Sequence, residues 1–179
     1  MWGFYLNHGA EWFLENIYHD GFTSVNEDGS VLTWHTAEKT SYQLVGFWKT
    51  NDGSTSSIQT FFIREGEIVR IEYYSYATRK TYLIYTLSRK DDLTIAVKRT
   101  CDDGQEVYFE IQAQKNEQGR VVLFRCTDAE EGFEAVALEY DEKGRIIRHR
   151  LSGAGAEDVI YEYTFDESGR VLSQKIADD

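Results

Sequence analysis

Turn signals recur along this chain at intervals that leave no room for crossover helices between strands. Each signal is a glycine preceded by a polar residue, and glycine supplies the positive φ that tight hairpin loops require. The 179 residues contain no proline, so the turns depend on glycine, asparagine and aspartate. Because parallel strands need long crossovers, the spacing excludes a parallel sheet and predicts an antiparallel meander. The signals are Asp28-Gly29, Asn51-Asp52-Gly53, Glu65-Gly66, Asp102-Asp103-Gly104, Gln118-Gly119, Lys143-Gly144 and Ser168-Gly169.

Between these turns, hydrophobic residues alternate with more polar ones, which is typical of strands with one buried face. Aromatic residues make up 15% of the chain and pack well on a pleated surface. We therefore expect a mainly β fold, an antiparallel meander of about a dozen strands that forms a curled sheet or half-barrel. The clearest alternating sets are Val69/Ile71/Tyr73, Leu93/Ile95/Val97, Val107/Phe109/Ile111 and Val159/Tyr161/Tyr163/Phe165.

One short N-terminal α-helix is predicted over residues 10–19. Its apolar residues recur at i, i+3 and i+4, while Glu11 and Glu15 face away from them. Asp20-Gly21 is expected to end it, with glycine in a left-handed cap. A helix of two to three turns is not stable alone, so we expect it to cover an apolar face of the sheet. The apolar stripe consists of Phe13, Leu14, Ile17 and Tyr18.

The C-terminal part carries a gapless repeat. Its glycines, Gly119, Gly144 and Gly169, are spaced 25 residues apart, as in stacked or meandering repeats. In each unit, Asp or Asn is expected to bond back to the backbone, and glycine to take the left-handed position. A degenerate copy begins at Asn26. The full copies are Asn116-Glu117-Gln118-Gly119-Arg120-Val121, Asp141-Glu142-Lys143-Gly144-Arg145-Ile146 and Asp166-Glu167-Ser168-Gly169-Arg170-Val171.

The segments Tyr140–Ile146 and Tyr161–Val171 resemble YD repeats, the hairpin units of RHS and related bacterial polymorphic-toxin proteins. The resemblance covers roughly residues 115–176, and the first unit departs from it with Lys115-Asn116 in place of Tyr-Asp. In that family the hairpins wind into a shell around a toxic domain, which a chain of this length is too short to build. Similar hairpins occur as free-standing bacterial proteins, some encoded beside toxins. The resemblance therefore implies a small bacterial toxin-immunity protein.

We predict one domain over residues 1–179. It comprises a helical N-terminal cap over residues 1–22, a β-meander over residues 23–114 and YD-like hairpin repeats over residues 115–179. A second resemblance, of Leu44–Lys49 to the Gly-x-Trp strand of lipocalin-like and fatty-acid-binding barrels, implies an alternative role as a small-molecule or lipid carrier. A non-catalytic structural repeat module is a further alternative.

The net charge of −12 and the pI of about 4.8 argue against nucleic-acid partners and against anionic membrane surfaces. No basic region followed by an apolar run opens the chain, and no apolar stretch is long enough to span a membrane. We therefore expect a cytoplasmic protein. In that compartment, Cys101 and Cys126 are expected to be buried, reduced thiols.

No residue pattern in the chain predicts catalysis, a cofactor or a metal site, so we do not expect an enzyme. The histidines show no ligand spacing, and His149, between Arg148 and Arg150, is expected in a solvated strand position with lowered proton affinity. Paired carboxylates fall at predicted loop tips rather than across a cleft. The histidines are His8, His19, His35 and His149, and the carboxylate pairs are Asp91-Asp92, Asp102-Asp103, Glu130-Glu131 and Glu157-Asp158.

Charge is distributed unevenly along the chain. Residues 1–38 hold six acidic residues and no Lys or Arg, residues 39–100 carry a net charge of +4, and residues 101–179 carry −10. Such an acidic region suits fast electrostatic capture of a basic protein. The leading hypothesis is therefore a cytoplasmic protein-binding module, an immunity protein that inhibits a basic toxin. The predicted partner-binding residues are Asp128, Glu130, Glu131, Glu134, Glu139 and Glu142.

Overall fold

The computed structural model describes residues 1–127, 135–153 and 157–177, which contain one helix and thirteen strands. The order agrees with the expected strand meander preceded by one helix. The elements are α1 (Trp2–Asn16), β1 (Thr23–Val25), β2 (Val31–Lys39), β3 (Gln43–Lys49), β4 (Thr55–Arg64), β5 (Glu67–Ser75), β6 (Lys80–Arg89), β7 (Thr94–Cys101), β8 (Glu106–Lys115), β9 (Val121–Cys126), β10 (Ala135–Tyr140), β11 (Ile146–Ser152), β12 (Val159–Phe165) and β13 (Val171–Ala177).

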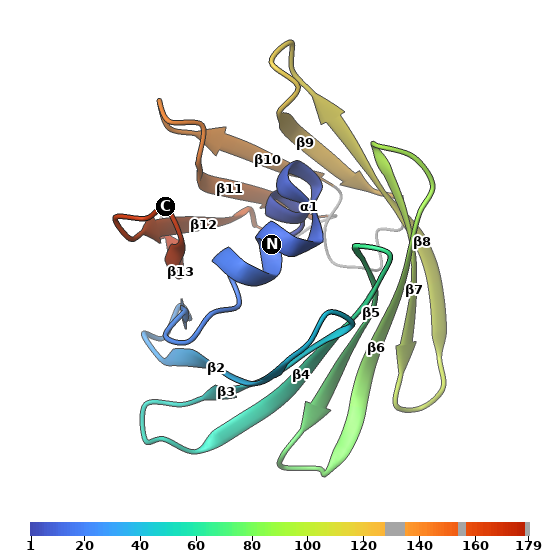
Figure 1. Cartoon of the computed structure of the whole chain (residues 1–179), viewed down its shortest axis with the longest axis vertical. Helices are drawn as coiled ribbons and strands as arrows, with labels where there is room; N and C mark the ends of the chain where they lie inside the picture. The colour runs from blue at the N-terminus through green and yellow to red at the C-terminus, as the bar shows by residue number, and fades with distance from the viewer. Residues whose placement is uncertain (128–134, 154–156, 178–179) are drawn as a thin grey trace.

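The strands form a closed barrel in which strands consecutive in the sequence pair antiparallel (Figure 1). The seam joins β1 to β13 in parallel, with Thr23 opposite Ser173. An up-and-down meander with an odd number of strands ends on a strand that runs in the same direction as the first, so this seam has to be parallel. The predicted meander is confirmed. The predicted curled sheet or half-barrel is wrong, because the pairing of β1 with β13 closes the sheet.

The helix lies inside the barrel, surrounded by the strands (Figure 1). Phe4, Phe13 and Leu14 are each 5% exposed or less and form one core with the inward side chains of the strands. Barrel diameter grows with strand number, and about eight strands already make an interior that side chains can fill. A barrel of thirteen strands is wider, so α1 fills space that the strands' own side chains leave.

The bounds of the helix differ from the predicted ones. It begins at Trp2 and ends at Asn16, with non-helical backbone at Gly9 (φ 79°, ψ 177°). Gly3 and Gly9 lower the helix propensity of the first turns of α1, so the sequence pattern does not predict these turns. Packing inside the barrel stabilises them instead. Ile17 and Tyr18 follow the end of the helix and are still buried.

Gly46 on β3 makes room for Trp34 on β2, a fully buried side chain. A Cβ atom at position 46 would lie 2.0 Å from Cζ2 of Trp34, so the indole packs directly against the glycine backbone. Trp48 lies opposite Trp34 in the ladder, and their rings are 5.3 Å apart. Gly46 and Trp48 therefore serve indole packing in the interior.

The predicted turns are confirmed in their backbone geometry. All seven signal glycines have positive φ, from 76° at Gly119 to 88° at Gly169. In the Asp141 unit, Gly144 N–H donates to the Asp141 carbonyl at 2.9 Å, and Arg145 N–H donates to Asp141 Oδ1 at 2.8 Å. The Asp166 unit forms the same two bonds at 3.1 and 2.9 Å. Equal spacing in the sequence thus gives equivalent hairpins.

Candidate functional site

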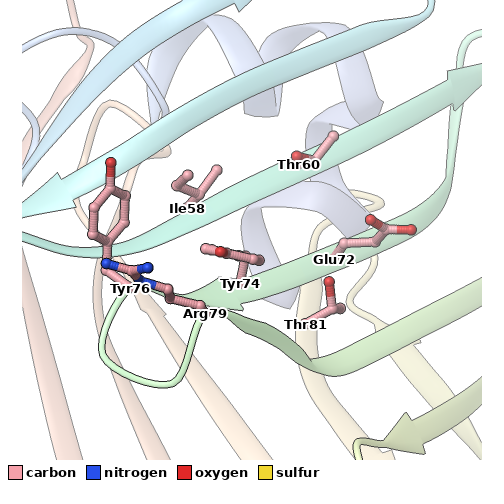
Figure 2. Close-up of a pocket in the computed structure, with 7 residues that line it drawn as sticks. All are labelled: Ile58, Thr60, Glu72, Tyr74, Tyr76, Arg79 and Thr81. Atoms are coloured by element: carbon pink, nitrogen blue, oxygen red, sulfur yellow. The ribbon is translucent and has the colours of Figure 1, made fainter.

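A groove of about 600 Å³ lies on the outer face of β4, β5 and β6 (Figure 2). Tyr76 and Arg79 lie at one end of it, and Thr60 and Glu72 lie at the other. It combines apolar, aromatic, hydroxyl and charged side chains on one surface. Its lining residues are Ile58, Thr60, Glu72, Tyr74, Tyr76, Arg79 and Thr81.

Strand register brings the floor of the groove together. Ile58 lies opposite Tyr74, and Thr60 lies opposite Glu72, across the β4–β5 ladder. Tyr74 in turn lies opposite Thr81 on β6. Side chains alternate between the two faces of a strand, so these residues point outward while their neighbours fill the interior.

The β5–β6 turn supplies the end of the groove that carries Tyr76 and Arg79. Arg79 has a φ of 54°, in the left-handed region. The Tyr76 side chain is 54% exposed, and its ring lies 6.4 Å from that of Tyr74 in an edge-to-face arrangement. Thr78 N–H donates to Ser75 Oγ at 3.3 Å within the same turn. The turn thus presents a second aromatic ring beside the one on the strand.

The charges of the groove do not cancel. Glu72 is neutralised by Arg70, whose Nη2 lies 2.5 Å from Glu72 Oε1. Arg79 and the adjacent Lys80 form no ion pair with any residue that the structure describes. The groove therefore offers an unpaired cationic end beside an aromatic floor.

The acidic residues predicted to bind a partner fall in two groups. Asp128, Glu130, Glu131 and Glu134 lie outside the described residues. Glu139 on β10 and Glu142 in the following turn are described, and both are exposed. The structure therefore shows two of the six side chains exposed, and a binding surface formed by all six stays a prediction.

Around Glu139 the barrel surface carries alternating charges. Glu139 lies opposite Arg148 on β11, and Arg148 Nη2 lies 2.8 Å from Glu162 Oε1 on β12. Lys175 Nζ on β13 lies 3.0 Å from Glu162 Oε2. Each acid in this row faces a cation, so the described part of the acidic region is locally balanced on its strand faces.

His149 is the clearest departure from the expected side-chain placement. It is 6% exposed rather than solvated, and its Nδ1 lies 2.7 Å from the Tyr163 hydroxyl. Burial, followed by the nearby amino group of Met1, lowers the pKa of His149 to about 2. The predicted lowering of the proton affinity of His149 therefore agrees in direction. Its main cause is burial, and not the flanking arginines as predicted.

The described residues contain no cluster of three or more His, Cys, Asp or Glu side chains that would hold a metal ion. Cys126 is buried as expected, whereas Cys101 is half-buried, and the two form no disulfide with each other. In the same described ranges, no helix is long and apolar enough to cross a membrane. We therefore take the outer groove as the candidate site.

Comparison with known proteins adds no assignment: no protein-family model matches the chain, and no curated protein matches it. The groove residues carry no sequence motif, because they come from three strands and a turn. The sequence signal for the groove is weak: Ile58 and Tyr74 are bulky residues at outward strand positions, where the alternation favours polar side chains, and Tyr76 is an aromatic residue in a turn.

Proposed function

We propose that this chain is a protein-binding module whose outer groove holds an extended segment of a partner protein. The observation that carries the proposal is the combination of Tyr74, Tyr76 and the unpaired Arg79 in one groove. Tyrosine and arginine are enriched among the residues that dominate binding energy at protein interfaces. Ile58 adds an apolar surface, and the threonine hydroxyls add hydrogen-bonding capacity at its edge.

The charges indicate the chemistry of the segment. Glu72 is already paired with Arg70, so the uncompensated charge at the groove is that of Arg79. A matching segment carries a carboxylate close to a bulky aliphatic or aromatic side chain. This surface is separate from the acidic residues of the C-terminal region, for which a basic partner and an immunity role remain predictions.

The lipid-carrier alternative receives less support. Small-molecule pockets span about 300–1,000 Å³, whereas α1 occupies the interior and leaves a cavity of about 160 Å³ against the β4–β6 wall. That cavity is too small for an acyl chain or a larger lipid.

The proposal is tested by panning a phage-displayed library of random twelve-residue peptides against the intact protein. We expect enrichment of acidic peptides that contain an aromatic or large aliphatic residue. Their dissociation constants, measured by fluorescence anisotropy, should rise about 10-fold for Arg79→Glu, because one attraction becomes a repulsion, and by a similar factor for Tyr74→Ala.

The matched controls are Arg125→Glu and Tyr108→Ala, which change exposed side chains on β9 and β8. Both should bind the selected peptides like the unchanged protein. The proposal is overturned if no peptide family is enriched, or if the groove variants and the control variants bind equally well.

A further inference from the structure

A second cavity lies inside the barrel, between α1 and the inner wall of β4, β5 and β6. Its volume is about 160 Å³. It is separate from the outer groove, because adjacent residues of β5 point to opposite faces, Tyr73 inward and Tyr74 outward. The lining residues are Met1, Trp2, Tyr5, Phe13, Tyr18, Gln59, Phe61, Ile68, Ile71, Tyr73 and Tyr85.

Aromatic rings form most of this lining. The rings of Tyr73 and Tyr85 are 6.1 Å apart and nearly perpendicular, on the strand side. From the other side, Trp2 and Tyr5 of α1 contribute rings that are also 6.1 Å apart. Aromatic rings favour edge-to-face and offset contacts with a further ring, so a flat aromatic guest suits these walls.

The Tyr73 hydroxyl in the wall accepts a hydrogen bond but donates none to the described residues. Gln59 is 2% exposed, and its Nε2 donates to the Tyr73 hydroxyl at 3.1 Å, while Trp48 Nε1 donates to Gln59 Oε1 at 3.2 Å. The Tyr73 oxygen thus accepts a hydrogen bond, but its own proton has no acceptor among the described residues. Burial raises the pKa of Tyr73 well above its usual value, so the hydroxyl stays protonated and able to donate.

The charges near the cavity pair with one another. The Tyr5 hydroxyl donates to Glu67, and Glu67 Oε1 accepts from Arg89 Nε at 3.1 Å. The remaining ionisable group of the lining is the α-amino group of Met1, and burial lowers its pKa to about 5, so it is mostly uncharged at neutral pH. A charged guest would also lose its hydration on entry.

We propose that this cavity binds a neutral, single-ring aromatic molecule with one oxygen that accepts a hydrogen bond from Tyr73, a molecule of the phenol class. The volume fits, since an apolar protein cavity of about 150 Å³ takes benzene. The ring fills the aromatic walls, and the oxygen receives the proton that the protein leaves without an acceptor.

Isothermal titration calorimetry of the intact protein with phenol, benzene and benzoate tests the proposal. We expect phenol to bind with a dissociation constant on the order of 1 mM or tighter, given its seven heavy atoms, benzene to bind more weakly, and benzoate not to bind. Tyr73→Phe should weaken phenol about 5- to 10-fold, because it removes one hydrogen bond, and should leave benzene unchanged. The control Tyr108→Phe, on the exposed outer face, should bind phenol like the unchanged protein.

A second variant, Ile71→Phe, fills part of the cavity and should abolish the binding of both phenol and benzene while the protein stays folded by circular dichroism. If Ile71→Phe does not fold, Tyr73→Phe and the phenol-to-benzene comparison decide the question. If phenol does not bind at a concentration 10-fold above the expected dissociation constant, the proposal is overturned and the cavity holds water alone. Equal phenol affinity in the unchanged protein and Tyr73→Phe overturns it as well.

Discussion

At the scale of single residues, His149 shows how a strand separates neighbours in the sequence. Arg148 and Arg150 lie on the outer face, where they approach Glu162 at 2.8 Å and Asp158 at 3.8 Å. The imidazole between them points inward and contacts Tyr163 and Tyr161, whose rings lie 5.4 and 4.7 Å away. A charged flank in the sequence therefore says little about the surroundings of an inward residue.

This burial makes the stability of the protein dependent on pH. The pKa of His149 is lowered to about 2, against 6.5 in the unfolded chain, so below pH 6.5 the unfolded state binds the proton preferentially. The contribution of the neutral, buried His149 to the free energy of unfolding is complete above pH 6.5. It is lost as the pH falls from 6.5 toward the lowered pKa. Each pH unit in that window costs about 1.4 kcal/mol, or roughly 2 kcal/mol at pH 5.

Urea unfolding between pH 7.5 and pH 4.5 checks this prediction. His149→Gln, which keeps a polar partner for Tyr163, should lose much less stability with falling pH than the unchanged protein does. The control is His35→Gln on the outer face of β2, which should retain the original pH slope. Parallel slopes for the unchanged protein and His149→Gln would contradict the assignment.

At the scale of elements, an arginine links each C-terminal hairpin to the next one. Arg145 donates through Nε to its own Asp141 at 2.7 Å, and its guanidinium lies 4.6 Å from the centre of the Phe165 ring in the next unit. Arg120 lies over Tyr140 in the same way, at 5.6 Å. The aromatic residue before each turn is therefore a platform for the arginine of the preceding turn.

This contact gives a physical reason for the irregular first unit. Lys115 stands where the later units have Tyr140 and Phe165. The turn that precedes Lys115 at the same end of the barrel joins β6 to β7, where Leu93 O accepts a hydrogen bond from Ala113 N–H at 2.7 Å. Residues 91–95 of that turn contain no arginine, so an aromatic residue at position 115 would have no guanidinium of the preceding turn to stack on.

A double-mutant cycle on Arg145 and Phe165 tests the link. Arg145→Gln, Phe165→Leu and the double variant should give a coupling free energy of unfolding of about 0.5–1 kcal/mol, as expected for a partly exposed cation–π pair. Arg170→Gln is the matched single control, since Arg170 pairs with Asp166 at 2.9 Å but stacks on no ring of the described chain. It should cost less than Arg145→Gln, and additive energies in the cycle would exclude the contact.

The same scale shows what local sequence predicts and what it does not. The turns and the strand alternation are encoded within a few residues, and Gly144 and Gly169 have the expected positive φ. The seam joins Thr23–Val25 to Ser173–Lys175, which lie about 150 residues apart, and no local pattern encodes that pairing. The outer groove likewise depends on register across three strands, so its residues cannot be grouped before the pairing is known.

At the scale of the whole molecule, barrel closure and the internal helix depend on each other. The thirteen strands alone enclose a space wider than inward side chains fill, and α1 is too short and irregular to be stable by itself. Packed together, they form one core, in which Phe13 lies 5.4 Å from Tyr18 and 6.3 Å from Phe61, between ring centres. The helix is therefore part of the fold's interior and not a cover on an open sheet.

Truncation of the helix core tests that interdependence. Phe13 is 5% exposed, and Phe13→Ala should lower the free energy of unfolding by about 3–5 kcal/mol, as large core truncations do. The matched control, Glu11→Ala, changes an exposed side chain of the same helix and should alter stability by less than about 0.5 kcal/mol. Removing residues 1–20 should abolish cooperative thermal unfolding, since the strands would then surround an unfilled interior. A truncated chain that kept its cooperative transition, or a Phe13→Ala loss below about 1 kcal/mol, would show that the barrel closes without help from α1.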